Sequence, residues 1–234
     1  MSDFISFPFY DLFQENGHVP EIRKKLPPLL AGVRRNILEI GAGTGLITTS
    51  LADWTPAEIF ALEPSAGMRA VLLSRLSSHP KLLKRVTVLP CDALSVDLDE
   101  PVEAVIMINV MYAMEPSYRK RLWPVLAAQL APGGLLVFTW RPGGPPPLHP
   151  LQEMESRQVG RHTYTGLSEI LEADEEAFRA RYLYRITEGE KVISEEEITG
   201  YAYRPAWDVI RHELVSAGFT QTEGAERLLA WRLR

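Results

Sequence analysis

Short apolar runs alternate with amphipathic stretches over the first 140 residues. We predict buried strands from five mostly apolar runs, at 36–40, 58–62, 85–89, 104–109 and 135–140. Helices are predicted between them, where apolar residues recur at helical spacing, at 46–54, 66–77 and 117–130. Strands that alternate with helices predict a parallel sheet covered by helices on both faces, with right-handed crossovers.

The pattern changes after residue 140. The segment 142–150 holds five prolines and two glycines, which predicts a rigid loop that leaves the sheet. The more polar region that follows predicts only two strands, at 181–187 and 191–203. A helix at 205–217 and a final antiparallel strand pair then return to the first pattern. The simplest arrangement is one sheet domain interrupted by an insertion.

Composition narrows the class of protein. A chain of 234 residues with 46% hydrophobic residues is typical of one α/β domain with an elaboration. The net charge of -5 and the lack of a long basic run argue against a nucleic-acid binder. The single cysteine, Cys91, allows no disulfide framework, and neither a signal peptide nor a long apolar run is visible. We therefore expect a cytoplasmic protein without a membrane partner.

The first strand is followed by alternating glycines. Gly41, Gly43 and Gly45 let the backbone turn sharply and let a ligand approach the start of the next helix. A dinucleotide fingerprint would need glycine at Leu46, and no P-loop lysine follows. Glu63 ends the second strand, where a carboxylate can accept hydrogen bonds from both hydroxyls of a ribose. These residues indicate a nucleoside-type ligand.

Five segments in order carry a family resemblance. Leu38–Gly45 resembles motif I of the class I, Rossmann-like S-adenosylmethionine-dependent methyltransferases, and Glu63 matches the ribose-binding acid of that family. Segment 91–93 resembles the motif that contacts the adenine of the cofactor, and segment 108–112 resembles the one that lines the methyl donor. Segment 130–135 resembles the Leu-x-Pro-Gly-Gly motif, which predicts a turn at 131–134 before the fifth strand. The resemblance covers roughly 30–140, and 206–234 fits as well. It is closest in character to the small-molecule and natural-product type.

The resemblance implies a fold and a cofactor. The expected sheet has seven strands in the order 3-2-1-4-5-7-6, the seventh antiparallel, with an N-terminal helical lid and an inserted antiparallel and helical cap. The expected cofactor is S-adenosyl-L-methionine. Its expected binding residues are Tyr10, Glu39, Gly41, Ala42, Gly43, Gly45, Glu63, Pro64, Met68, Cys91, Asp92, Ala93, Asn109 and Val110.

The acceptor side is less determined. Asn109-Val110-Met111-Tyr112 departs from the Asn/Asp-Pro-Pro-aromatic segment of many nucleobase N-methyltransferases, which argues against that activity. Tyr112 is a candidate wall of the methyl-transfer pocket, and His149 or His162 could act as a general base. His149 is the first choice because it follows the fifth strand. Other histidines are expected in exposed positions: His18, His79 and His212.

These expectations define three parts and one activity. We expect a lid at 1–30, a cofactor-binding domain at 31–141 and 205–234, and a substrate cap at 142–204. The expected reaction moves a methyl group to an oxygen or nitrogen of a small molecule. Two alternatives remain open. One is a peptide, protein or RNA methyltransferase, and the other is a cofactor-binding protein that does not methylate. No metal site is expected, because the acidic run 195–197 is interpreted as a solvated face, and the oligomeric state is open.

Overall fold

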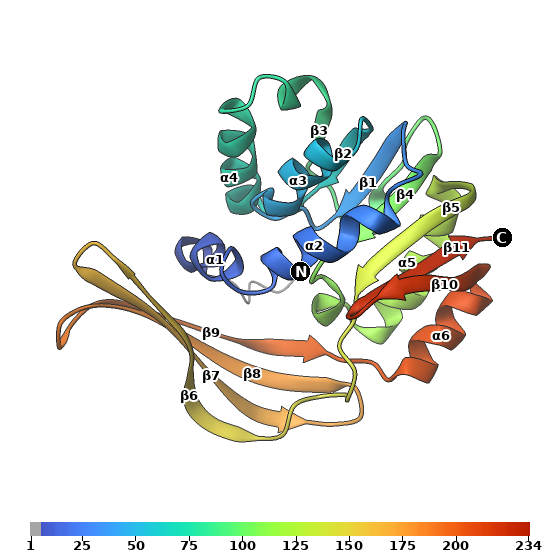
Figure 1. Cartoon of the computed structure of the whole chain (residues 1–234). Coiled ribbons are helices and arrows are strands. Elements are labelled where there is room, and N and C mark those ends of the chain that lie inside the picture. Colours follow the sequence, from blue (N-terminus) through green and yellow to red (C-terminus); the bar gives the residue numbers. More distant parts are fainter. Residues whose placement is uncertain (1–5) are drawn as a thin grey trace.

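The computed structural model describes residues 6–234 and contains a seven-stranded and a four-stranded sheet (Figure 1). The larger sheet has the order β3-β2-β1-β4-β5-β11-β10. Its parallel strands are β1 (Asn36–Ile40), β2 (Glu58–Leu62), β3 (Val86–Leu89), β4 (Val102–Met107) and β5 (Leu130–Thr139). The antiparallel pair β10 (Phe219–Ala225) and β11 (Leu228–Leu233) completes it. The strand order predicted from the sequence is confirmed.

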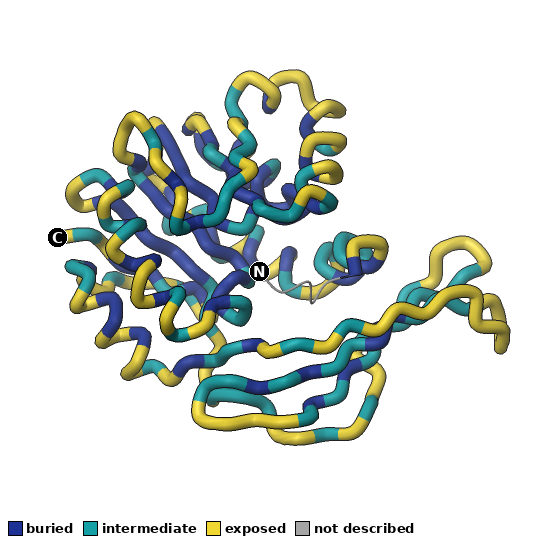
Figure 2. Tube along the Cα trace, turned by 180° about the vertical axis from the view of Figure 1, so that it is seen from behind, coloured by how far each residue is buried: buried dark blue, intermediate teal, exposed yellow. Residues whose placement is uncertain are grey.

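Helices cover both faces of this sheet and bury its strands (Figure 2). One face packs against α2 (Val19–Leu29), α3 (Leu46–Trp54) and α4 (Ala66–Ser77). The other packs against α5 (Pro116–Gln129) and α6 (Trp207–Ser216). Short helices η1 (Leu82–Lys84), η2 (Ala93–Ser95) and η3 (Met111–Ala113) lie in the connections. None of the helices within residues 6–234 has the length and apolar character needed to cross a membrane.

The insertion forms an antiparallel sheet of four strands, not the two that were predicted, and the expectation of a partly helical cap is wrong because residues 142–204 contain no helix. Its strands are β6 (His149–Val159), β7 (His162–Ala173), β8 (Ala177–Glu188) and β9 (Lys191–Tyr203), paired in chain order. The first two were missed because their hydrophobic alternation is faint. The inward face of β7 includes Gly166 and Ser168, which are buried without being apolar. Neighbouring strands, not an apolar pattern, determine these elements.

One turn predicted from the sequence is also different. Residues 131–134 lie inside β5 instead of preceding it, and the pairing register with β4 shifts between Val102 and Ala104. Gly133 has φ +74°, so the segment is an irregular start of the strand.

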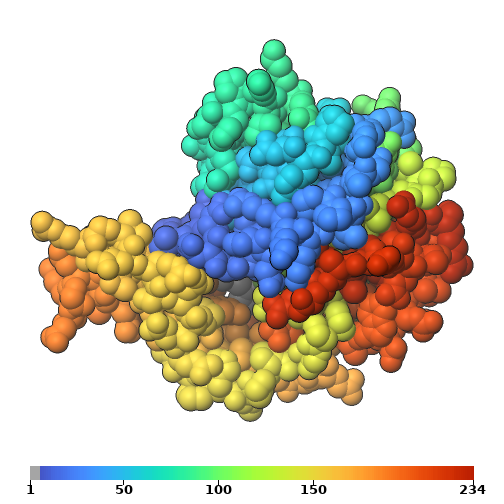
Figure 3. All heavy atoms as spheres, viewed as in Figure 1, coloured from blue at the N-terminus to red at the C-terminus, as the bar shows by residue number. Residues whose placement is uncertain are grey.

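Helix α1 (Phe7–Gln14) lies between the two sheets, as the ribbon and the space-filling view both show (Figures 1 and 3). Its buried Phe9 and Phe13 face the four-stranded sheet, and the ring of Phe9 lies 5.1 Å from that of Tyr184. Phe13 packs so closely on Gly166 that a Cβ there would lie 2.8 Å from its ring. The opposite side of α1 reaches the seven-stranded sheet, where the Asp11 carboxylate binds Thr44 and Arg75.

Candidate active site

The glycine loop between β1 and α3 has the backbone that its sequence predicts. Gly41, Gly43 and Gly45 all have positive φ angles, of +70°, +58° and +85°. A Cβ on Gly41 would lie 2.3 Å from Cγ1 of Val110, and one on Gly45 would lie 2.4 Å from Cδ1 of Leu72. Glycine is therefore required for both conformation and space, and the loop places its backbone at the carboxyl end of β1.

Glu63 organises this loop from the end of β2. Its Oε2 accepts a hydrogen bond from the Gly43 N–H at 2.9 Å, and its Oε1 accepts one from the Ser65 N–H at 2.8 Å. The side chain is only 6% exposed. Two oxygens offer about four lone-pair sites, so the carboxylate retains capacity to accept further hydrogen bonds from a ligand.

Glu39 is a second buried acid, on β1. The Thr48 hydroxyl donates to its Oε2 at 2.6 Å. Burial, opposed by this hydrogen bond, raises the pKa of Glu39 to about 8, and the nearby charge of Glu63 acts in the same direction. A cationic ligand beside the loop would favour the ionised form of Glu39.

Tyr10 of α1 covers the glycine loop. Its hydroxyl would lie 3.5 Å from a Cβ built on Gly43. Burial raises the pKa of Tyr10 to about 12, and the charges of Asp11, Glu63 and Glu39 add to the shift. The phenol therefore stays protonated and can donate a hydrogen bond near neutral pH.

A cavity of about 850 Å³ opens above the loop, and we call it the loop cavity. It is lined by more than half of the cofactor residues expected from the sequence, namely Tyr10, Gly41, Gly43, Glu63, Pro64, Met68, Asn109 and Val110. Other expected residues do not line it: Glu39, Ala42, Gly45, Cys91, Asp92 and Ala93. Asp92 instead accepts hydrogen bonds from the Tyr118 hydroxyl, at 3.0 Å, and from the Leu94 N–H, at 2.9 Å.

The chemistry of the loop cavity fits the cofactor expected from the sequence. S-adenosylmethionine carries ribose hydroxyls, a sulfonium and an ammonium group, and Glu63 offers acceptor oxygens and negative charge to such groups. Glu196 and Glu197 of β9 also line this cavity. The acidic run 195–197 is thus more than the solvated face that was predicted, although Glu195 is paired with Arg185 at 2.7 Å. The described residues contain no group of three or more potential ligands that could hold a metal ion.

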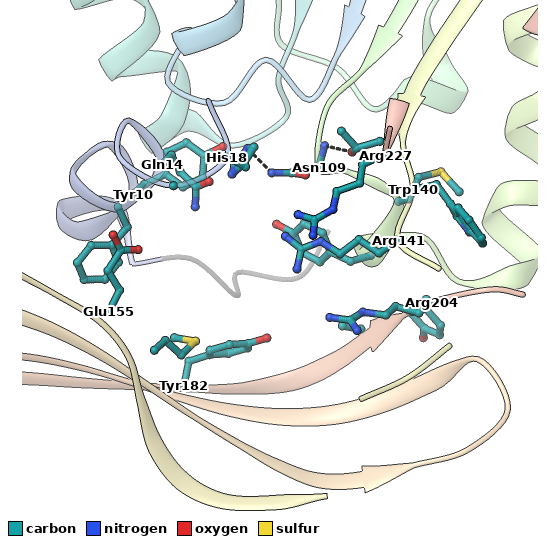
Figure 4. Close-up of a pocket in the computed structure, with 18 of the residues that line it drawn as sticks. Tyr10, Gln14, His18, Asn109, Trp140, Arg141, Glu155, Tyr182, Arg204 and Arg227 are labelled. Carbon is teal, nitrogen blue, oxygen red and sulfur yellow. Dashed lines mark hydrogen bonds between the residues drawn. The ribbon is translucent and has the colours of Figure 1, made fainter. Parts of the chain in front are cut away.

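A second cavity of about 710 Å³ lies between α1, the ends of β4 and β5, and the four-stranded sheet (Figure 4). We call it the cap cavity. Three residues line both cavities: Tyr10, Asn109 and Tyr112. Tyr112 packs beside the apolar cluster of Ile170, Phe178, Ala180 and Ala202. Burial raises the pKa of Tyr112, so its phenol also stays protonated. The two cavities meet at these three residues.

Asn109 is held in an unusual conformation at this junction. It has φ +54°, its N–H donates to the Thr139 hydroxyl at 2.6 Å, and its side-chain amide contacts Nε2 of His18. Burial, with Arg141 acting in the same direction, lowers the pKa of His18 to about 4. His18 is therefore neutral at pH 7. The expectation that it is exposed is wrong, because α1 and α2 fold it against the end of β4.

The structure does not bring His149 to the junction. It begins β6, its Nδ1 contacts the Pro150 carbonyl oxygen at 2.9 Å, and it lines neither cavity. His162 lines neither cavity either. Residues that the sequence analysis missed include His18, Arg141, Arg204 and Arg227, all of which line the cap cavity. Arg141 directly follows Trp140 of the apolar run 135–140, and this position was its only local signal.

Part of this chain matches a known protein family. Residues 37–134 match the family described as a methyltransferase domain. The chain contains a methyltransferase domain. A relative named as an uncharacterized methyltransferase of Mycobacterium tuberculosis is 32% identical over 123 residues, which cover 50% of this chain and 46% of the relative. The match thus spans about half the length of each protein.

Solved structures show the same fold over the whole chain. CalS10 of Micromonospora echinaspora, described as an amino pentose methyltransferase bound to S-adenosylmethionine, has a TM-score of 0.77 at 16% identity, with 100% of both chains covered. KedS8 of Streptoalloteichus, described as a sugar N-methyltransferase, has a TM-score of 0.73 at 19% identity, covering 96% of this chain and 92% of that one. The class I methyltransferase fold predicted from the sequence is confirmed, including the antiparallel cap.

Proposed function

We propose that this protein transfers the methyl group of S-adenosylmethionine to an oxygen or nitrogen atom of a small molecule. One observation carries the proposal: the loop cavity and the cap cavity meet at Tyr10, Asn109 and Tyr112. A cofactor on the glycine loop and an acceptor under the cap would therefore approach each other at these three residues. The methyltransferase match and the fold support the same reaction.

The cofactor brings an electrophilic methyl group on a sulfonium when bound, and the protein supplies binding and orientation. We infer that Glu63 accepts the ribose hydroxyls while it holds Gly43 and Ser65. Glu39, buried on β1 with its pKa raised to about 8, contributes negative charge only where the cationic cofactor favours its ionised form. The proposed adenine contacts remain Cys91, Asp92 and Ala93. For this role the Asp92 carboxylate has to give up its hydrogen bond from the Tyr118 hydroxyl, or accept hydrogen bonds from Tyr118 and the adenine at the same time.

The chain's own contribution to the reaction is positioning. Asn109 faces both cavities, and His18, kept neutral by burial, orients its amide. Holding the nucleophile in line with the transferred methyl group replaces an encounter in solution by a preformed geometry. A role for His149 as general base remains a prediction from the sequence. Its position does not support that role, because it has no contact with the junction.

The size of the cap cavity, about 710 Å³, supports a small acceptor over a peptide or an RNA. Aromatic side chains from both the lid and the cap line it, including Phe13, Phe178 and Tyr182. The amino pentose and sugar N-methyltransferase neighbours make an amino sugar a reasonable first acceptor to test. We retain the division into lid, cofactor-binding domain and cap as part of this proposal, together with a cytoplasmic location.

The proposal is tested first by binding. Calorimetry on the full chain is expected to show saturable binding of S-adenosylhomocysteine and no binding of NAD. Mass spectrometry would then detect methyl transfer to a panel of amines and hydroxyl compounds. Binding of NAD without binding of S-adenosylhomocysteine would overturn the proposed activity.

A further inference from the structure

Three arginines from separate segments converge on the cap cavity. Arg141 follows β5, Arg204 follows β9, and Arg227 lies between β10 and β11. Their guanidinium groups extend into the same side of the cavity in the close-up view (Figure 4). The convergence of three chain segments depends on the docking of the four-stranded sheet beside the carboxyl ends of β4 and β5.

Two of these cations, Arg141 and Arg204, have no carboxylate partner among residues 6–234. Arg204 instead lies with its guanidinium carbon 5.5 Å from the centre of the Phe178 ring. Arg227 has only a long contact, with Nη1 3.9 Å from Oε2 of Glu21. Several other arginines pair with a carboxylate at close range, as Arg181 does with Glu169 at 2.7 Å. The cap cavity therefore presents uncompensated positive charge.

The pKa shifts of neighbouring groups agree with this arrangement. Burial, followed by repulsion from Arg141, lowers the pKa of Arg204. The charge of Arg141 also acts to lower the pKa of His18, and both arginines oppose the burial that raises the pKa of Tyr182. A partly desolvated cation beside a second cation is unfavourable in isolation, and an anion between them would relieve both costs.

The acidic residues of the cavity are placed elsewhere. Glu155 lies beside Tyr10, on the opposite side of the view from the arginines (Figure 4), and pairs with Arg157 at 2.5 Å. Glu21 lies closer to the arginines, with its Oε2 3.9 Å from Nη1 of Arg227 and 4.0 Å from Nζ of Lys25. The end of the cavity that holds the three arginines therefore carries more positive than negative charge.

We propose that the methyl acceptor carries an anionic group, a carboxylate or a phosphate, and that Arg141 and Arg204 bind this group, with Arg227 at the rim. The inference rests on the proposed function, since it names the class of acceptor. Planar guanidinium groups match the paired oxygens of both anions and bind them through two parallel hydrogen bonds. An acceptor anchored at this end directs its remaining length toward Asn109 and Tyr112, where the methyl group would be transferred.

The test uses the full chain saturated with S-adenosylhomocysteine and two probes, pyrophosphate and succinate, titrated by calorimetry at low salt. We expect at least one anion to bind saturably, and Arg204→Gln and Arg141→Gln each to raise its dissociation constant at least tenfold. Arg185→Gln is the matched control, because Arg185 is on the same sheet, is paired with Glu195 and does not line the cavity. It should change the constant less than twofold. Binding of pyrophosphate alone identifies a phosphate, and binding of succinate alone identifies a carboxylate.

Two results would overturn the proposal: neither anion binds the wild-type protein, or the Arg141→Gln/Arg204→Gln double variant binds it as tightly as wild type. Arg141 is exposed, so its single variant remains informative if Arg204→Gln does not fold. Titration of S-adenosylhomocysteine into the same preparations separates the two ideas. Loss of anion binding with intact cofactor binding contradicts only the acceptor class, whereas failure of the wild-type protein to bind the cofactor product contradicts the proposed function.

Discussion

The Oε2 atom of Glu63 lies 2.9 Å from the backbone nitrogen of Gly43, although the two residues are 20 positions apart in the chain. This bond joins the end of β2 to the loop after β1, and it aims the remaining capacity of the carboxylate at the loop cavity. One side chain thus both shapes the loop and faces the proposed ligand.

We predict that Glu63→Gln weakens binding of S-adenosylhomocysteine at least tenfold. The amide replaces one acceptor oxygen by a donor that faces an N–H group, and hydrogen bonds to a charged group contribute roughly 1.5–3 kcal/mol each. About 1.4 kcal/mol corresponds to a factor of ten in the dissociation constant. Calorimetry measures the change. Glu58→Gln, at the exposed start of the same strand, is the control, and equal affinities of the two variants would contradict a ligand role for Glu63.

A second prediction concerns the attachment of α1 to the glycine loop through Asp11. Asp11→Asn removes the ion pair with Arg75 and weakens the bond from Thr44, so α1 should open more often. We expect faster amide hydrogen exchange in residues 7–14 and a several-fold weaker affinity for S-adenosylhomocysteine. Glu15→Gln, which loses its pair with Arg23 at 2.6 Å, is the control. Unchanged exchange in Asp11→Asn would show that packing of Phe9 and Phe13 alone holds the helix.

The junction gives a third prediction, on turnover. His18→Gln should lower kcat at least tenfold and leave the affinity for S-adenosylhomocysteine within about twofold, because His18 orients Asn109 without lining the loop cavity. His149→Gln provides the comparison, since His149 was the base predicted from the sequence. If His149→Gln lowers kcat and His18→Gln does not, the result would support His149 as the general base and would contradict a positioning role for His18.

The neutrality of His18 gives a fourth prediction, on stability. Burial and Arg141 lower its pKa from 6.5 to about 4, opposed by Glu21. The unfolded chain therefore binds a proton more readily, so this contribution is complete above pH 6.5 and is lost as the pH falls through 4. At about 1.4 kcal/mol per pKa unit, the loss near pH 4.5 is about 2–3 kcal/mol.

Urea unfolding of the wild-type protein and His18→Gln at pH 7.5 and 4.5 measures this difference. The variant should lose less stability on acidification than the wild-type protein by that amount. His79→Gln, which alters an exposed histidine, should behave as the wild-type protein does. If His18→Gln loses as much stability between pH 7.5 and 4.5 as the wild-type protein does, groups other than His18 cause the acid sensitivity.

The residues of the site that directly follow a predicted strand could be identified from the sequence. Gly41 and Glu63 each directly follow a buried strand, and the carboxyl ends of neighbouring parallel strands meet at one sheet edge. Local pattern therefore sufficed for the glycine loop, whereas the order of the strands in the sheet came from the family resemblance.

The cap cavity was not predictable in the same way. His18 reaches Asn109 across 91 positions, and the meeting of Arg141 with Arg204 depends on how the inserted sheet packs. No local periodicity encodes such contacts. The strand β7 was missed for a related reason, since Gly166 is buried by Phe13 of α1 but has no side chain that could give a hydrophobic signal.

The last prediction concerns the anchor of the cap on the cofactor-binding domain. Arg119 of α5 is fully buried and donates to Glu213 of α6 from Nε and Nη2, both at 3.2 Å, and to Glu176 between β7 and β8 at 3.0 Å. The Trp123 indole also donates to Glu213 at 2.8 Å. Glu213→Gln leaves a buried cation with its main counter-charge removed, so we expect a loss of roughly 3–5 kcal/mol of unfolding free energy.

Glu176→Gln tests the cap side of the same cation. Glu176 is partly exposed and Glu213 still balances the charge of Arg119, so we expect a loss below about 1 kcal/mol. The more specific readout is local: amide hydrogen exchange in the turn 174–177 should accelerate while that in α5 is unchanged. Urea unfolding and exchange measured by mass spectrometry distinguish the two variants. Equal destabilisation by both would show that Glu176, and with it the docking of the cap, contributes as much to folding as the buried pair does.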